Sequence, residues 1–161
     1  MTLKQLFVGV LERQAEQATN LRARISWLSR ALALDPDNAT LLSKRALAKG
    51  IGAGDADHAA ALALAPLDPM VRVRRGQALR HGAFVAWLEH RSQDPKDLQP
   101  QLHPAIACAT EALDLAPNLR PALALRISCH MQLNNLDLAL ADARRLLEQN
   151  PGDIFGLRTF G

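Results

Sequence analysis

The sequence predicts an all-α protein, for three reasons. The chain of 161 residues is dominated by alanine and leucine, is only 4% aromatic and has few β-branched residues, so intrinsic propensities favour helices over strands. Its apolar residues recur mostly at every third or fourth position, which is the spacing of one helix face. The phrase Ala31-Leu32-Ala33-Leu34-Asp35-Pro36 also returns three times in altered form. We therefore expect helices separated by copies of this phrase.

Each copy of the phrase combines the end of one helix with the start of the next. A proline disfavours helical backbone in the residue before it, so the apolar run ends there, and the Asp or Asn that follows can cap a new helix. The prolines of the phrase are 30, 51 and 34 residues apart, and they are Pro36, Pro66, Pro117 and Pro151. Spacings in this range are typical of stacked helical repeats.

Small residues recur at one place in the helices that follow the phrase. Ala46 follows Pro36 by ten residues, and Gly76 follows Pro66 by the same number. With these positions and the phrase, the chain resembles the tetratricopeptide repeat (TPR) family, whose unit is a helix-turn-helix of about 34 residues. The resemblance implies a right-handed α-solenoid of antiparallel helix pairs. It also implies that small residues lie where helices cross, namely Ala46, Gly76, Ala105, Ala112 and Ala139.

The resemblance divides the chain, taken as one domain of residues 1–161, into about four units. They are residues 1–36, 37–66, 67–117 with an insertion near 85–103, and 118–151, followed by a helical stub at 153–161. Turns inside the units are expected near Thr19, Gly52 and Asn134. The expected helix caps are Asn20, Asn38 and Asp153.

The third unit is the least regular. Residues 70–75 alternate like a strand, but the repeat requires a helix at this place, and we predict one. Residues 81–82 are expected to interrupt this helix, which resumes over 84–91. Because the interval of 51 residues exceeds the family's period by 17, we predict an inserted helix with its loop. The polar residues 92–103 would form an exposed loop, and Pro104 would open the next helix.

Composition constrains the partner and the compartment. A net charge of +3 and a pI near 9.3 favour an acidic partner without requiring nucleic acid. Cys108 and Cys129 are expected to be free and buried, because nothing in the sequence indicates an oxidising compartment. The apolar run of residues 6–11 is too short for a signal or membrane segment. We therefore predict a cytoplasmic protein with no membrane segment, and we leave self-association open.

The sequence carries no pattern typical of a catalytic, metal or nucleotide site. The stretch Gly50-Ile51-Gly52-Ala53-Gly54 follows an expected helix instead of a strand and lacks a Lys-Ser/Thr ending, so we interpret it as a turn. The histidines have no local pair of the kind that zinc sites usually show, and they are His58, His81, His90, His103 and His130. We expect no cofactor, no metal and no catalysis. A site in the 92–103 loop is the enzymatic alternative.

An arginine-rich ridge is the best candidate for a binding surface. Arg74, Gln77 and Arg80 are three residues apart in series and would share one helix face. The resemblance implies that this face, together with His81, lines a concave groove. Lys44 of the preceding unit is a further cationic candidate. A solvated face is the alternative, because charge runs on helices often serve solubility alone.

These features predict a non-catalytic protein-interaction module: an adaptor, scaffold or chaperone-like protein that binds a peptide or helix in the groove. Arginines on the groove would select an acidic partner, because guanidinium groups pair with carboxylates. The alternative is a nucleic-acid-associated helical repeat protein that uses its basic face. The mild net charge makes nucleic acid the less favoured partner.

Overall fold

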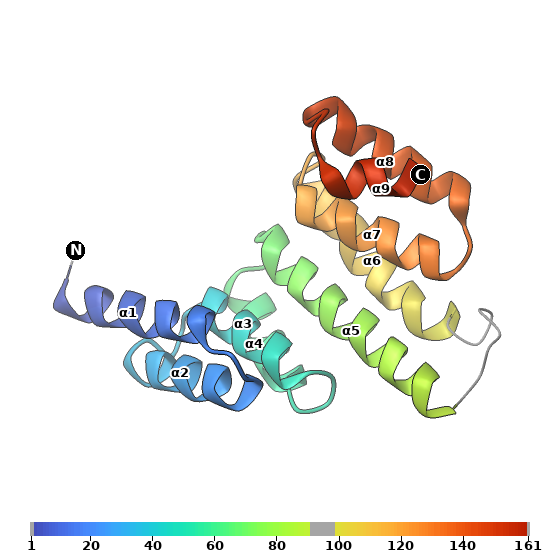
Figure 1. The fold of residues 1–161 in the computed structure, drawn as a ribbon. Helices are drawn as coiled ribbons and strands as arrows, with labels where there is room; N and C mark the ends of the chain where they lie inside the picture. Colours follow the sequence, from blue (N-terminus) through green and yellow to red (C-terminus); the bar gives the residue numbers. More distant parts are fainter. Residues whose placement is uncertain (1, 91–98, 161) are drawn as a thin grey trace. The chain divides into compact units, whose positions relative to one another are not determined.

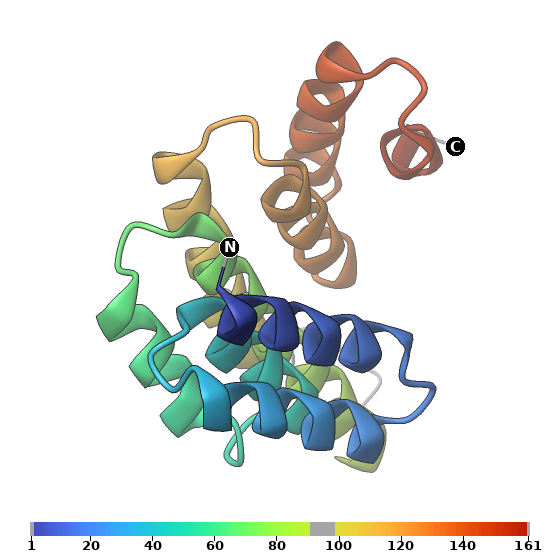
Figure 2. The same ribbon diagram turned by 90° about the vertical axis from the view of Figure 1, so that its left-hand side faces the viewer.

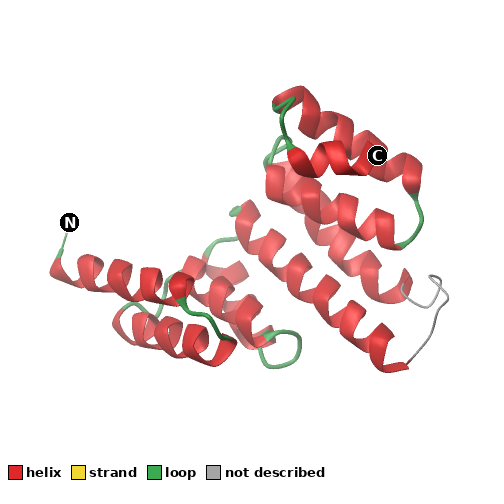
Figure 3. Ribbon diagram, in the orientation of Figure 1, coloured by secondary structure: helices red, strands yellow, loops and turns green. Residues whose placement is uncertain are grey.

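A computed structural model describes residues 2–90 and 99–160 of the chain. All regular secondary structure in these residues is helical, with no strand, as Figure 3 shows. The helices are α1 (Leu3–Gln17), α2 (Leu21–Leu34), α3 (Ala39–Lys49), α4 (Asp55–Leu64), α5 (Pro69–His90), α6 (Gln99–Leu115), α7 (Arg120–Gln132), α8 (Leu136–Gln149) and α9 (Ile154–Phe160). The prediction of an all-α protein is confirmed.

The helices form two compact units, Met1–Leu67 and Asp68–Gly161, which we call the first and the second unit. In the first unit, α1 packs against α2, α2 against α3, and α3 against α4 (Figures 1 and 2). The second unit is built in the same way from α5 to α9, and α5 also contacts α7. Each unit therefore consists of successive helices that fold back on one another. The division into four repeats within a single domain stays a prediction.

Helix ends follow the recurring phrase. The helices α2, α4, α6 and α8 each end two residues before a phrase proline, because proline disfavours helical backbone in the residue that precedes it. The predicted caps are also confirmed. Asn20 Oδ1 accepts a hydrogen bond from the Ala23 N–H, and Asn38 Oδ1 accepts one from the Leu41 N–H. Local sequence chemistry thus determines where these helices begin and end.

The glycine-rich stretch is a turn between α3 and α4, as predicted. Gly50 and Gly52 have φ angles of 77° and 79°, which residues with a side chain rarely adopt. A Cβ atom on Gly54 would lie only 2.3 Å from the carbonyl oxygen of Ala46. This close approach of the two backbones requires glycine and explains the stretch without a bound phosphate. Asn134, with φ of 58°, makes the predicted turn between α7 and α8.

The predicted interruption of α5 is wrong. The helix runs from Pro69 to His90 through His81 and Gly82 without a break. A glycine inside a helix costs about 1 kcal/mol relative to alanine. The extensive packing of α5 along α6 outweighs this local cost, since Ala83 is buried in a cluster that receives Leu102 from α6.

The predicted loop at 92–103 is wrong for the part that the structure describes, while residues 92–98 lie outside the described residues. Helix α6 begins at Gln99, so Pro104 lies inside the helix instead of opening it. Leu102 is fully buried in the cluster between α5, α6 and α7. Burial of this side chain stabilises the helical conformation of an otherwise polar stretch. Among the described residues, the extra length of the third interval therefore lies in α5 and α6, which are longer than the other helices. These residues contain no separate inserted helix.

The small residues singled out in the sequence are buried. Ala46, Ala105, Ala112 and Ala139 have 0% exposure. At Gly76, an added Cβ would lie 2.6 Å from Leu125 Cδ2 on α7 and 3.1 Å from the carbonyl oxygen of Ala105 on α6. Gly76 thus allows α5 to approach both neighbouring helices closely.

Candidate functional site

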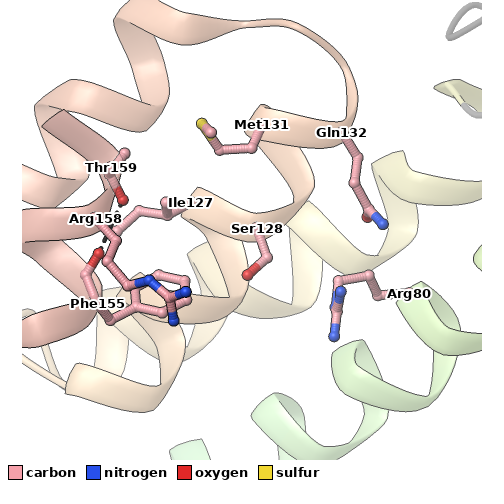
Figure 4. Close-up of a pocket in the computed structure, with 8 residues that line it drawn as sticks. All are labelled: Arg80, Ile127, Ser128, Met131, Gln132, Phe155, Arg158 and Thr159. Atoms are coloured by element: carbon pink, nitrogen blue, oxygen red, sulfur yellow. Dashed lines mark hydrogen bonds between the residues drawn. The ribbon is translucent and has the colours of Figure 1, made fainter. Parts of the chain in front are cut away.

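A pocket of ≈ 320 Å³ lies in the second unit and is formed by α5, α7 and α9 (Figure 4). We call it the α5–α7–α9 pocket. One lining residue comes from α5, four from α7 and three from α9. They are Arg80, Ile127, Ser128, Met131, Gln132, Phe155, Arg158 and Thr159.

The floor of the pocket is a continuation of the core. Ile127 is 1% exposed and belongs to a buried cluster with Val73 and Leu123. Phe155 packs against the same cluster from α9, and Met131 lies one helical turn beyond Ile127. The apolar floor is therefore held in place by the packing of the unit.

Helix α9 is anchored by Asp153. Its Oδ1 accepts hydrogen bonds from the N–H groups of Phe155 and Gly156, which caps the helix as predicted. Arg120 of α7 donates to the same carboxylate, and this hydrogen bond lowers the pKa of Asp153 below its ordinary value, as does the one from the Gly156 N–H. A Cβ on Gly156 would lie 3.1 Å from Leu147 Cδ2 of α8. These contacts position the wall of the pocket that carries Arg158.

The charged residues of the pocket are both arginines. Arg80 comes from α5 and Arg158 from α9, and none of the eight lining residues is acidic. Within residues 2–90 and 99–160, neither arginine forms an ion pair. The Oε1 atom of Gln132 is buried and has no hydrogen-bond partner in the described structure. The pocket thus combines two guanidinium groups with an apolar floor.

Of the predicted ridge, Arg80 alone is among the residues that line the pocket. Gln77 and Arg74 are half-buried on α5, and His81 is exposed. Arg74 interacts with other parts of the protein. Binding of a partner by the ridge of Arg74, Gln77 and Arg80 stays a prediction.

Lys44 has a visible role inside the first unit. Its Nζ lies 2.6 Å from Glu12 Oε1 and 2.7 Å from Glu16 Oε1, so it ties α3 to α1. Burial works against the charge, but the hydrogen bonds to both carboxylates raise the pKa of Lys44 above its ordinary value. The ammonium group already has two acidic partners within its own unit.

The sequence patterns did not indicate the contributions of α7 and α9, although the repeat contains a signal for α7. Gln77 and Arg80 follow Pro66 by 11 and 14 residues, and Ser128 and Met131 follow Pro117 by the same numbers. The repeat spacing therefore predicts that Ser128 and Met131 of α7 occupy the same positions as Gln77 and Arg80 of α5. Because Met131 is apolar and stands at the position of Arg80, a pattern of charged residues does not reveal this equivalence.

The potential metal ligands of residues 2–90 and 99–160 do not form a cluster. No group of three or more His, Cys, Asp or Glu side chains in these ranges is placed to hold a metal ion. Both cysteines are free and buried, as predicted. Burial raises the pKa of Cys108, and it raises the pKa of Cys129 to about 11, so neither thiol is activated as a nucleophile.

Comparisons of the sequence with models of known protein families and with curated proteins gave no match. Membership of the TPR family therefore stays a prediction. None of the helices in the described part of the chain has the length and apolar character needed to cross a membrane. Fold and pocket together define an all-helical protein with an arginine-flanked apolar pocket.

Proposed function

We propose that this chain is a non-catalytic protein-interaction module of the TPR type, which binds a peptide or helix of a partner in the α5–α7–α9 pocket. The observation that supports this proposal is that the helices following three successive phrase prolines, Pro66, Pro117 and Pro151, contribute side chains to one pocket. In a right-handed solenoid of helix pairs, these first helices would line a common concave surface. The protein would then act as a cytoplasmic adaptor, scaffold or chaperone-like protein.

The composition of the pocket suits recognition of a side chain better than catalysis. Ile127, Met131 and Phe155 offer apolar surface, and Arg80 and Arg158 offer hydrogen-bond donors of fixed geometry. Apolar anchors surrounded by a few polar groups are typical of binding sites in which a small number of contacts dominate the affinity. Met131 is 45% exposed, so its side chain is accessible to a partner.

Selection of a random peptide library on the folded chain tests this proposal. Peptides enriched on the parent should be lost from a Met131→Glu variant, because a carboxylate on the floor occupies the pocket and pairs with its arginines. Leu115→Glu is the matched control, since Leu115 is 40% exposed and lies outside the pocket. Peptides that bind all three proteins equally would place recognition elsewhere and contradict the proposal.

Nucleic acid is the competing occupant of this basic surface. If the pocket recognises a peptide, a random oligonucleotide should not displace the selected peptides. Displacement by the oligonucleotide, with binding that weakens steeply as salt rises, would favour the nucleic-acid alternative instead.

A further inference from the structure

The charges of the α5–α7–α9 pocket indicate the chemical class of its occupant. Arg80 and Arg158 reach it from two different helices, and no lining residue is acidic. Neither guanidinium forms an ion pair with any described residue, whereas Arg45, Arg72, Arg120 and Arg126 each hold a carboxylate. Arginine forms its strongest hydrogen bonds with carboxylates. The pocket therefore offers two donors that no acidic side chain among the described residues of the second unit satisfies.

The two arginines flank an apolar floor. Figure 4 shows Arg80 on the side of α5 and Arg158 on the side of α9, with Ile127 and Ser128 between them. A ligand with a charge alone would leave the surface of Ile127, Met131 and Phe155 in water. A purely apolar ligand would desolvate the guanidinium groups without giving them a partner. The best fit is a ligand that carries a carboxylate beside a bulky apolar group.

The hydroxyl and amide groups of the pocket are suited to a peptide. The Ser128 hydroxyl donates to the Ala124 carbonyl oxygen, and the Thr159 hydroxyl donates to the Phe155 carbonyl oxygen, so both hydroxyl oxygens remain as acceptors. The Gln132 side-chain oxygen is an acceptor without a partner in the described structure. Backbone N–H groups of a peptide could donate to the two hydroxyl oxygens while its carboxylate meets the arginines.

We infer that the pocket recognises a carboxylate adjacent to a large apolar side chain in the partner peptide, with Arg80 and Arg158 as the carboxylate-binding residues. This inference rests on the proposed function and specifies its ligand. An internal Asp or Glu and a chain-terminal carboxylate present the same chemistry to the pocket. The experiment has to separate these two sources.

A pair of small probes tests the carboxylate directly. 4-Phenylbutyrate carries an aromatic ring and a carboxylate, and 4-phenylbutanamide has the same shape without the charge. Titrations followed by NMR should give saturable shifts at Met131 and at the arginine side chains, with the carboxylate binding at least about tenfold more tightly than the amide. Equal affinity of the two probes would overturn the inference.

Variants locate the charge effect. Arg80→Gln and Arg158→Gln should each weaken binding of 4-phenylbutyrate about tenfold and leave binding of the amide unchanged. Arg144→Gln is the matched control, because Arg144 is exposed on α8 and outside the pocket. Unchanged affinity in both pocket variants, with melting temperatures equal to that of the parent, would show that the arginines do not hold the carboxylate.

The peptide selection separates failure of this inference from failure of the proposed function. Enriched peptides should contain Asp or Glu beside a large apolar residue, or should end in a free carboxylate next to one; amidating the C-terminus tells these two sources apart. Peptides that need Met131 but contain no acid and ignore both arginine variants would contradict the inference and leave the interaction module standing. If no peptide is enriched and neither probe binds, both proposals fail.

Discussion

Arg126 of α7 donates two hydrogen bonds to the carboxylate of Asp142 on α8. Its Nε and Nη2 atoms lie 2.7 Å from Asp142 Oδ2 and Oδ1, and its Nη1 lies 3.2 Å from Thr110 Oγ1 on α6. In the first unit, Arg45 binds Asp57 with two distances of 2.8 Å, and it lies 3.4 Å from the Ser29 hydroxyl. Each of these arginine–aspartate pairs ties the two helices of a hairpin together.

The two pairs occupy equivalent places in the repeat. Arg45 and Arg126 each follow a phrase proline by nine residues, and Asp57 and Asp142 each precede the next one by nine. Charged hydrogen-bonding groups at such buried positions select one alignment of the two helices, because any other leaves a charge without a partner. The pairs thus link a sequence spacing to the geometry of a helical hairpin.

We predict that Asp142→Asn strongly destabilises the second unit. The Asp142 side chain is 6% exposed, and its loss leaves the guanidinium of Arg126, 18% exposed, without its carboxylate. Removing one partner of a buried pair costs about 3 kcal/mol. Urea unfolding measures the change. The exposed Asp137→Asn is the control, expected within about 0.5 kcal/mol of the parent, and equal stability of the two variants would argue against the pair's role.

The third interval lacks an aspartate at this place, which leads to a second prediction. Counting nine residues from the prolines places Arg75 and Cys108 where the other units have arginine and aspartate. Burial raises the pKa of Cys108, and the nearby charge of Arg75 partly opposes this effect. Cys108→Asp should therefore be tolerated much better than Cys129→Asp, whose carboxylate would enter an apolar cluster. Thermal melting compares the two. A larger loss for Cys108→Asp would show that Arg75 cannot take a carboxylate partner.

Gly76 gives a third prediction. A methyl group there would lie 3.1 Å from the Ala105 carbonyl oxygen and from Cys108 Cβ, so even Gly76→Ala should destabilise the protein despite the better helix propensity of alanine. Gly76→Leu should cost about 1–3 kcal/mol or more by overpacking. Gly9→Ala in α1 is the control, since nothing lies within 4 Å of its added Cβ, and it should gain about 0.5–1 kcal/mol. Chemical denaturation of the three variants decides; a stabilising Gly76→Ala would contradict the tight crossing.

The fourth prediction concerns pH. Burial lowers the pKa of His130 below its ordinary value of 6.5, although Asp142 acts in the opposite direction and Arg126 supports the shift. The folded protein thus keeps this imidazole neutral, and the unfolded chain takes up the proton first. Its contribution to stability is complete above pH 6.5 and is lost as the pH falls through the lower folded-state pKa.

Urea midpoints between about pH 7.5 and 5.5 test this dependence. His130→Gln should flatten the decrease in stability on acidification, whereas His81→Gln, at an exposed position, should leave it as in the parent. A parent and a His130→Gln variant with parallel pH profiles would contradict the assignment.

The sequence by itself determined the features that depend on a few neighbouring residues. Proline chemistry ended α2, α4, α6 and α8 where the phrase predicts, side chains of Asn20, Asn38 and Asp153 capped the helices that follow them, and Gly52 and Asn134 made the predicted turns. These outcomes follow from local sterics and hydrogen bonds.

Only the tertiary structure decided which helices continue and which side chains meet. Helix α5 passes through Gly82, and α6 begins at Gln99, because burial of Ala83 and Leu102 against each other's helices outweighs local preferences. The candidate site needed the same information, since Arg80 gains Met131 and Arg158 as pocket neighbours only when α7 and α9 pack beside it. Packing between residues distant in the chain carries this free energy, and a short stretch of sequence does not contain it.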